Sequence, residues 1–199
     1  MVNRHLAHHI TSEDIQNLPL MAFEGTIKVI ETEDECKEAV NILRREKYLG
    51  FDTETKPTFT KGEYNHTALV QLATMETTYL FRLNKMGYPS SLFSLLENPA
   101  ITKFGISIAD DLKDLKKARK YKPAGFIDLN DVAKELEVKH MGVKKLAAVF
   151  LGYRISKNQQ TSNWENEELT EAQQRYAATD AWICLAIYDK LLRQGYVEE

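Results

Sequence analysis

The sequence predicts an α/β protein whose mixed β-sheet carries helices on both faces. Three strand patterns follow one another closely between residues 48 and 81, which implies antiparallel neighbours, whereas the later strands are separated by helices. The chain has 199 residues, of which 43% are hydrophobic and 28% charged. This length and composition fit one globular domain that buries roughly 70% of the surface of its unfolded chain.

We divide the chain into an N-terminal arm, residues 1–23, and a single domain, residues 24–199. Within the arm, Thr11 and the acids after it can cap a short helical turn. The first residues lack the apolar centre of a signal peptide, and no run of about 18 apolar residues occurs. We therefore expect a soluble, cytoplasmic protein that does not bind a membrane. The net charge of −3 argues against binding nucleic acid through a bulk positive field.

Regular patterns begin at residue 26. Residues 26–30 alternate as a strand, and Thr32 with Glu35 forms a capping box for a helix that reaches about Lys47. The next strand is 48–55. After a polar loop, two further apolar runs predict a hairpin of strands at 68–73 and 78–81.

The second half of the chain alternates between helices and short strands. Ser90 or Ser91 is expected to cap a short helix that ends at Glu97. The following patterns predict a strand at 101–106, a helix at 109–120, a strand at 126–127 and helices at 129–136 and 143–151. Gly152 ends the last of these, and a polar connection, 154–168, leads to a capping box at Thr170 that opens the final helix. Cys36 and Cys184 lie within helical patterns, so buried thiols are the expectation.

Two carboxylates stand at the end of the strand 48–55. Asp52 and Glu54 are residues i and i+2, so they point to one face of the strand, roughly 7 Å apart along it. Burying two ionised acids side by side is costly unless a hard divalent cation accompanies them. The pair therefore suggests half of a metal site, with a solvated strand end as the alternative.

Further acids follow in two helices. Asp110 and Asp111 lie in the first turn of the helix 109–120, where the positive end of the helix dipole stabilises them. We assign Asp110 to capping and Asp111 to function, because Asp111 faces the end of the strand 48–55. In the final helix, Tyr176 and Asp180 are four residues apart and share one face.

Taken together in this order, these residues resemble the DEDD superfamily of 3′-to-5′ exonucleases. Arg175 stands where the histidine-bearing branch would place its histidine, so the tyrosine-bearing branch is the match. The segments 104–112, 162–164 and 176–180 look like those of the Werner-type exonuclease domain and of the catalytic domain of ribonuclease D. The resemblance covers about residues 24–193 and implies a ribonuclease H-like fold.

The resemblance also implies a two-metal-ion mechanism with Mg²⁺ or Mn²⁺. Asp52, Glu54 and Asp180 would hold one ion, and Asp52 with Asp111, directly or through water, the second. Tyr176 has an ordinary pKa near 10 and is a poor base at neutral pH, so we assign it to orienting the attacking water. The implied products are nucleoside 5′-monophosphates released from a free 3′ end.

Contacts with the nucleic acid are predicted at three positions. The resemblance suggests the backbone of Thr53 and, in the connection before the final helix, Lys157 and Trp164. Trp164 has an alternative role, which is to anchor that connection by burying its ring.

The leading hypothesis is thus a metal-dependent exonuclease acting on single-stranded or recessed-end DNA, with RNA as the alternative substrate. DNA is favoured because the chain ends soon after the final helix, without the helical binding domains that follow the nuclease in ribonuclease D. A nucleic-acid-binding or partner-binding module without turnover is the second hypothesis. An endonuclease on the same fold is the third.

Overall fold

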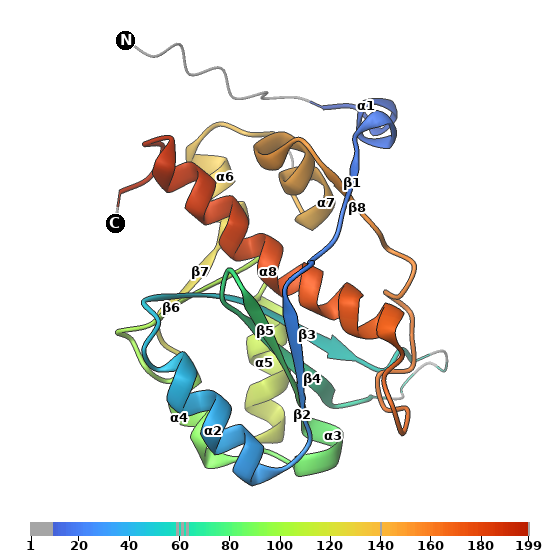
Figure 1. Cartoon of the computed structure of the whole chain (residues 1–199), viewed down its shortest axis with the longest axis vertical. Coiled ribbons are helices and arrows are strands. Elements are labelled where there is room, and N and C mark those ends of the chain that lie inside the picture. The colour runs from blue at the N-terminus through green and yellow to red at the C-terminus, as the bar shows by residue number, and fades with distance from the viewer. Residues whose placement is uncertain (1–9, 59, 61, 63, 140, 199) are drawn as a thin grey trace.

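A six-stranded mixed sheet forms the centre of the molecule (Figure 1). The computed structural model describes residues 10–58, 60, 62, 64–139 and 141–198. The strands lie in the order β2 (Thr26–Ile30), β5 (Thr77–Arg82), β4 (Thr67–Ala73), β3 (Tyr48–Thr55), β6 (Thr102–Gly105) and β7 (Phe126–Asp128). Neighbours β3–β4 and β4–β5 are antiparallel and the other pairs are parallel. The predicted mixed sheet is confirmed.

Helices cover both faces of this sheet, as predicted. One face meets α2 (Glu33–Leu43), α3 (Leu83–Met86), α4 (Ser90–Leu96) and α5 (Ala109–Ala118). The other meets the long helix α8 (Glu171–Arg193), with α6 (Leu129–Glu135), α7 (Val143–Leu146) and the π-helical turn η1 (Ala147–Leu151) packed beside it. Figure 1 shows α8 running across the sheet on the side opposite α2 and α4. Among the described residues, no helix has the length and apolar character needed to cross a membrane.

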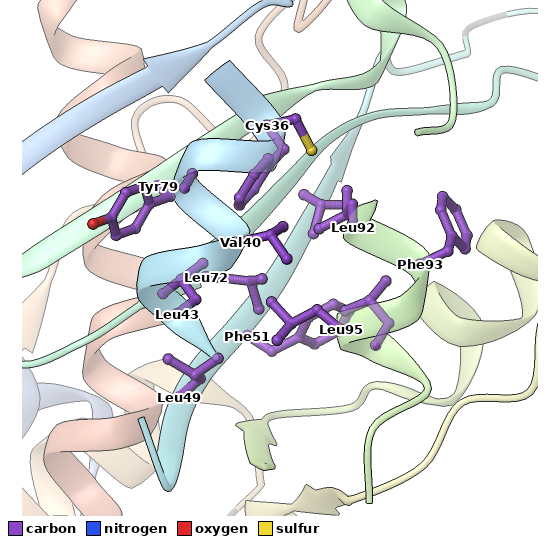
Figure 2. Close-up of a cluster of buried hydrophobic side chains, with 14 of the residues drawn as sticks. Cys36, Val40, Leu43, Leu49, Phe51, Leu72, Tyr79, Leu92, Phe93 and Leu95 are labelled. Atoms are coloured by element: carbon purple, nitrogen blue, oxygen red, sulfur yellow. The ribbon is translucent and has the colours of Figure 1, made fainter. Parts of the chain in front are cut away.

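Strand β3 divides its residues between the two faces. Leu49 and Phe51 join a large apolar cluster with residues of α2 and α4, shown in Figure 2. Gly50, Asp52 and Glu54 alternate with them, so they point toward α8. The strand therefore presents apolar side chains to one layer of helices and acids to the other.

Capping signals in the sequence located the starts of α1, α2 and α8. Thr32 and Thr170 each form the predicted capping box, Thr11 caps α1 as predicted and also forms such a box, and Gly152 ends η1 with a left-handed φ of 77°. The cap expected at Ser90 or Ser91 was wrong. Pro89 occupies the N-cap of α4, while the hydroxyl of Ser90 accepts a hydrogen bond from Arg119 and that of Ser91 contacts the Cys36 thiol.

Some element bounds also differ from the prediction. Helix α2 ends at Leu43 rather than near Lys47, because the backbone N–H groups of Arg45 and Glu46 already bond to carbonyls three residues earlier, as in a turn. The helix predicted at 143–151 is an α-helical turn followed by the π-helical η1, a change that a 3.6-residue periodicity does not reveal.

The end of the N-terminal arm is attached to the domain. After α1 (Ser12–Asn17), strand β1 (Leu20–Met21) pairs in parallel with β8 (Arg154–Ile155), which lies in the connection predicted to be irregular. The backbone N–H of Phe23 donates to the Thr179 hydroxyl at 2.9 Å. Two-residue strands have too little periodicity to be predicted, so this pairing emerged only from the fold.

Candidate active site

Strand β3 and helix α8 approach each other unusually closely next to the predicted acids. A Cβ atom added to Gly50 would lie only 2.0 Å from the carbonyl oxygen of Ala181, so only glycine fits there. The neighbouring α8 residues Ala177 and Ala178 are small and fully buried. This contact brings Asp180, which precedes Ala181, next to Asp52, which lies two residues beyond Gly50.

Three of the predicted acids meet at this contact. Asp52, Glu54 and Asp180 each offer a carboxylate oxygen, and these oxygens lie within 4.8 Å of one another. Asp180 is 7% exposed, and the other two are partly buried. A cluster of carboxylate oxygens is the donor set that hard divalent cations such as Mg²⁺ and Mn²⁺ take in proteins, so the residues fit a metal site.

The electrostatics of the three acids agree with this interpretation. Burial raises the pKa of Asp52 well above its ordinary value, and the charges of Asp180 and Asp111 raise it further. Burial and the charge of Asp52 raise the pKa of Glu54 to about 10. Burial raises the pKa of Asp180 to about 7, against the lowering effects of a hydrogen bond from Tyr176 and the charge of Lys157. Without a cation, the three groups therefore resist ionising together.

Tyr176 lies on the same side of α8 as Asp180, one turn earlier, as predicted. Its hydroxyl is close enough to the Asp180 carboxylate to lower the pKa of that acid by hydrogen bonding. Burial, together with the nearby acids, raises the pKa of Tyr176 above its ordinary value. The phenol thus stays protonated at neutral pH and can act as a hydrogen-bond donor, not as a base.

Trp164 does not fit a direct contact with nucleic acid. Its ring is 0% exposed and packs in a cluster with Leu69, Leu80 and Ala177. The ring centroids of Trp164 and Tyr176 are 6.0 Å apart. Trp164 therefore has the alternative role, which is to anchor the connection before α8. Within the site, its ring contacts Tyr176.

Asp111 lies beside the cluster rather than in it. Its carboxylate accepts a hydrogen bond from the hydroxyl of Thr53, which points to the opposite face of β3 from Asp52 and Glu54. Burial raises the pKa of Asp111, and the Thr53 hydrogen bond partly offsets this. Thr53, predicted as a backbone contact to substrate, has an additional role here, since its side chain fixes Asp111.

The capping role assigned to Asp110 was wrong. The first residues of α5 receive no side-chain cap from within the helix. Instead Asp128, at the end of β7, accepts hydrogen bonds from the backbone N–H groups of Ser107 and Ile108, both at 3.1 Å. Asp128 thereby holds the turn that leads into α5 and its acid Asp111. The sequence signal that could have singled out Asp128 is its position directly before α6, because aspartate is a favoured N-cap.

Lys157 lies at the rim of the acidic cluster, and its predicted contact with substrate stays a prediction. It is exposed, and it lines two adjoining hollows that also contain Asp52 and Asp180. One hollow extends along Glu54 and Tyr176, and the other toward Ser107 and Gly142. The positive charge of Lys157 at this rim can attract the phosphate of a bound strand while the acids below it are occupied by metal ions.

The fold and the site together define a nuclease of the ribonuclease H-like class. The sequence matches the 3′-5′ exonuclease family over residues 27–195, and the chain belongs to this family, whose members hydrolyse phosphodiester bonds. The predicted family and enzyme class are confirmed.

Individual relatives agree with this assignment. The chain is 35% identical over 189 residues to the bifunctional 3′-5′ exonuclease/ATP-dependent helicase WRN of Mus musculus, covering 90% of this chain and 14% of the mouse protein. The EXO domain of Aedes aegypti Nibbler superposes with a TM-score of 0.80 at 23% identity, covering 87% of this chain and 92% of that domain. Escherichia coli RNase D, an exoribonuclease, gives a TM-score of 0.76 at 26% identity, with 86% of this chain and 45% of that chain covered. The chain thus spans a small part of its mouse relative and under half of RNase D.

Proposed function

We propose that the protein is a metal-dependent 3′-to-5′ exonuclease that releases nucleoside 5′-monophosphates and prefers DNA to RNA. The observation that carries this proposal is the meeting of carboxylate oxygens of Asp52, Glu54 and Asp180 within 4.8 Å, with Tyr176 one turn before Asp180 in α8. The domain bounds 24–199 and a cytoplasmic location stay predictions.

The residues present would hold two ions of Mg²⁺ or Mn²⁺. We assign Asp52, Glu54 and Asp180 to one ion, and Asp52 with Asp111 to the other. When bound, such ions activate water for attack on a phosphodiester and stabilise the charge that develops on the leaving oxygen. Thr53 leaves the second oxygen of the Asp111 carboxylate available for this role, because only one oxygen accepts its hydroxyl.

The other residues act on the substrate and the water. Tyr176, protonated and held against Asp180, would orient the attacking water by a hydrogen bond. Lys157 would position the phosphate of the strand at the rim of the acidic cluster. Trp164 would keep the Tyr176 ring in place through their packing contact.

DNA is proposed as the substrate on the resemblance to the Werner-type exonuclease domain, which the 35% identity to the mouse exonuclease/helicase over 189 residues supports. Telling RNA from DNA requires a contact with the 2′-hydroxyl. The degradation rates of a DNA strand and an RNA strand of the same sequence therefore decide which substrate is preferred.

The test is degradation of 5′-labelled single-stranded DNA, recessed-end duplex DNA and single-stranded RNA of one sequence, each with Mg²⁺ or Mn²⁺. We expect a ladder that shortens from the 3′ end, nucleoside 5′-monophosphates as products and faster degradation of DNA. Asp52→Ala should abolish the ladder. Asp111→Asn should weaken it strongly, whereas Asp110→Asn, which changes the exposed neighbouring acid, should not.

Other outcomes would select the competing hypotheses. If wild type and Asp52→Ala were equally inert with every substrate and metal, the module without turnover would replace the exonuclease. Internal fragments in place of a ladder would indicate an endonuclease. Faster degradation of RNA would reverse the substrate preference but leave the exonuclease assignment intact.

A further inference from the structure

Gln71 lies directly across the sheet from Asp52. The two residues are opposite each other in the antiparallel pair of β3 and β4. Directly opposed residues have Cα atoms about 4.5–5.5 Å apart and side chains on the same face. The Gln71 amide therefore lies beside the Asp52 carboxylate on the face covered by α8, and it is 0% exposed.

The amide has no hydrogen-bond partner in the part of the chain that the structure describes. Neither Nε2 nor Oε1 of Gln71 is paired, although both atoms are buried. Leaving a buried polar group unpaired lowers the stability of the fold. The neighbours in the same layer, Leu69 and Leu80, are apolar and pack with Trp164. An apolar residue at position 71 would therefore suit the fold better than glutamine does.

We propose that Gln71 is a positioning residue of the candidate metal site, whose Nε2 donates a hydrogen bond to the Asp52 carboxylate when that group ligates a cation. The inference rests on the proposed function, since it needs Asp52 to be a ligand. A donor from the opposite strand would fix the plane of the Asp52 carboxylate toward Glu54 and Asp180.

The chemistry of an amide suits this position. It donates a hydrogen bond without carrying charge, so it orients a carboxylate without competing with the cation that the carboxylate binds. A lysine or arginine at position 71 would neutralise Asp52 and weaken cation binding. A leucine would leave the carboxylate free to rotate.

The test compares Gln71→Met, which removes the amide at nearly constant volume, with wild type in the full chain. Mn²⁺ binding is measured by titration without nucleic acid, and thermal unfolding is measured without metal. We expect Mn²⁺ affinity and kcat to fall about 10- to 100-fold with little change in KM for the oligonucleotide. The melting temperature of the metal-free protein should stay the same or rise.

A matched control is Thr78→Val, because Thr78 also has a buried, unpaired hydroxyl on this face but lies opposite Ala73 rather than an acid. It should leave Mn²⁺ affinity and rate unchanged. Gln71→Asn, whose shorter side chain keeps the amide but withdraws it, should weaken Mn²⁺ binding as Gln71→Met does. This second variant decides the question if Gln71→Met does not fold.

The proposal is overturned if both Gln71 variants bind Mn²⁺ within twofold of wild type. It is also overturned if Gln71→Met melts well below wild type or does not fold while Gln71→Asn binds Mn²⁺ as wild type does, because the amide would then serve the fold. These outcomes differ from failure of the proposed function, in which wild type and Asp52→Ala would bind Mn²⁺ equally weakly.

Discussion

Strands β3, β4 and β5 carry different kinds of residue on their two faces. Toward α2 and α4 they present a continuous apolar set, Leu49, Phe51, Val70, Leu72, Tyr79 and Phe81. Figure 2 shows several of these packed against Val40, Leu43 and Leu92. Toward α8 the same strands present Gly50, Asp52, Glu54, Gln71, Thr78 and Arg82 among a few apolar residues.

With the exception of Thr53, which points away from α8 and fixes Asp111, this difference separates stability from chemistry within one sheet. The α2 and α4 face gains the free energy of burying apolar surface, at about 25 cal/mol per Å². The α8 face retains groups that are costly to bury, including the unpaired Gln71 amide and the acids with raised pKa values. Arg82 on this face is also buried: its Nη atoms donate to Glu31 and to the carbonyls of Glu167 and Asn166, whereas its Nε has no partner among the described residues. Substitutions on the two faces should therefore have opposite effects.

The largest effect is expected from Asp180→Asn on the α8 face. Replacing one of three clustered ligands should lower the rate of oligonucleotide degradation by at least about 1,000-fold. At pH 8 the same change should raise the melting temperature of the metal-free protein by about 3–6 °C, because it removes a buried charge. A variant that lost activity together with stability would contradict the division between the faces.

On the opposite face, Phe93→Ala should do the reverse. Phe93 is 1% exposed and packs edge-on against Tyr121 with ring centroids 4.9 Å apart. Its truncation should lower the free energy of unfolding by about 3–5 kcal/mol, measured by urea denaturation. Activity per folded molecule should stay within about threefold, because packing and not site geometry is lost. A much larger loss of specific activity would show that the faces are coupled.

Stability should fall as pH rises, and a cation should reverse the fall. The pKa of Asp180 is raised from 3.8 to about 7 in the fold, so the folded state binds more protons than the unfolded state between these values. Asp180 therefore leaves the free energy of unfolding unchanged below about pH 4 and lowers it progressively as the pH rises to about 7. The raised pKa of Glu54, about 10, extends the loss to higher pH.

The measurement is the melting temperature from pH 5 to pH 8, with and without Mg²⁺. Mg²⁺ should raise it by several degrees at pH 8 and by much less at pH 5, where protons compete for the carboxylates. Asp180→Asn should flatten the metal-free profile. If the melting temperature of the metal-free wild type rose with pH, Asp180 and Glu54 would not be buried together.

The smallest effect is expected from Thr53→Val, which removes the hydroxyl that donates to Asp111. We expect a rate about 10-fold below wild type, as is typical for partners that orient a ligand. Thr53→Ser keeps the hydroxyl and should retain most of the rate. Equal rates for Val and Ser variants would show that Asp111 needs no support from β3.

Local signals predicted much of the fold. Capping boxes at Thr32 and Thr170 depend only on residues three apart, and the alternation of residues 48–55 depends only on the strand itself. The cap at Ser90 or Ser91 failed because distant partners compete for both hydroxyls, namely Arg119 and Cys36. Asp110 failed as a cap for a similar reason, because Asp128, from the distant strand β7, accepts the backbone hydrogen bond before α5 instead.

The sequence by itself determined the type of fold, the ordered set of acids and tyrosine, and the family. These follow from short-range periodicity and from residue identity. Only the tertiary structure decided that Trp164 is buried, that Thr53 fixes Asp111 and that Gln71 stands opposite Asp52. Each of these facts depends on strand register or helix packing between segments distant in the chain, and such contacts leave no local pattern to read.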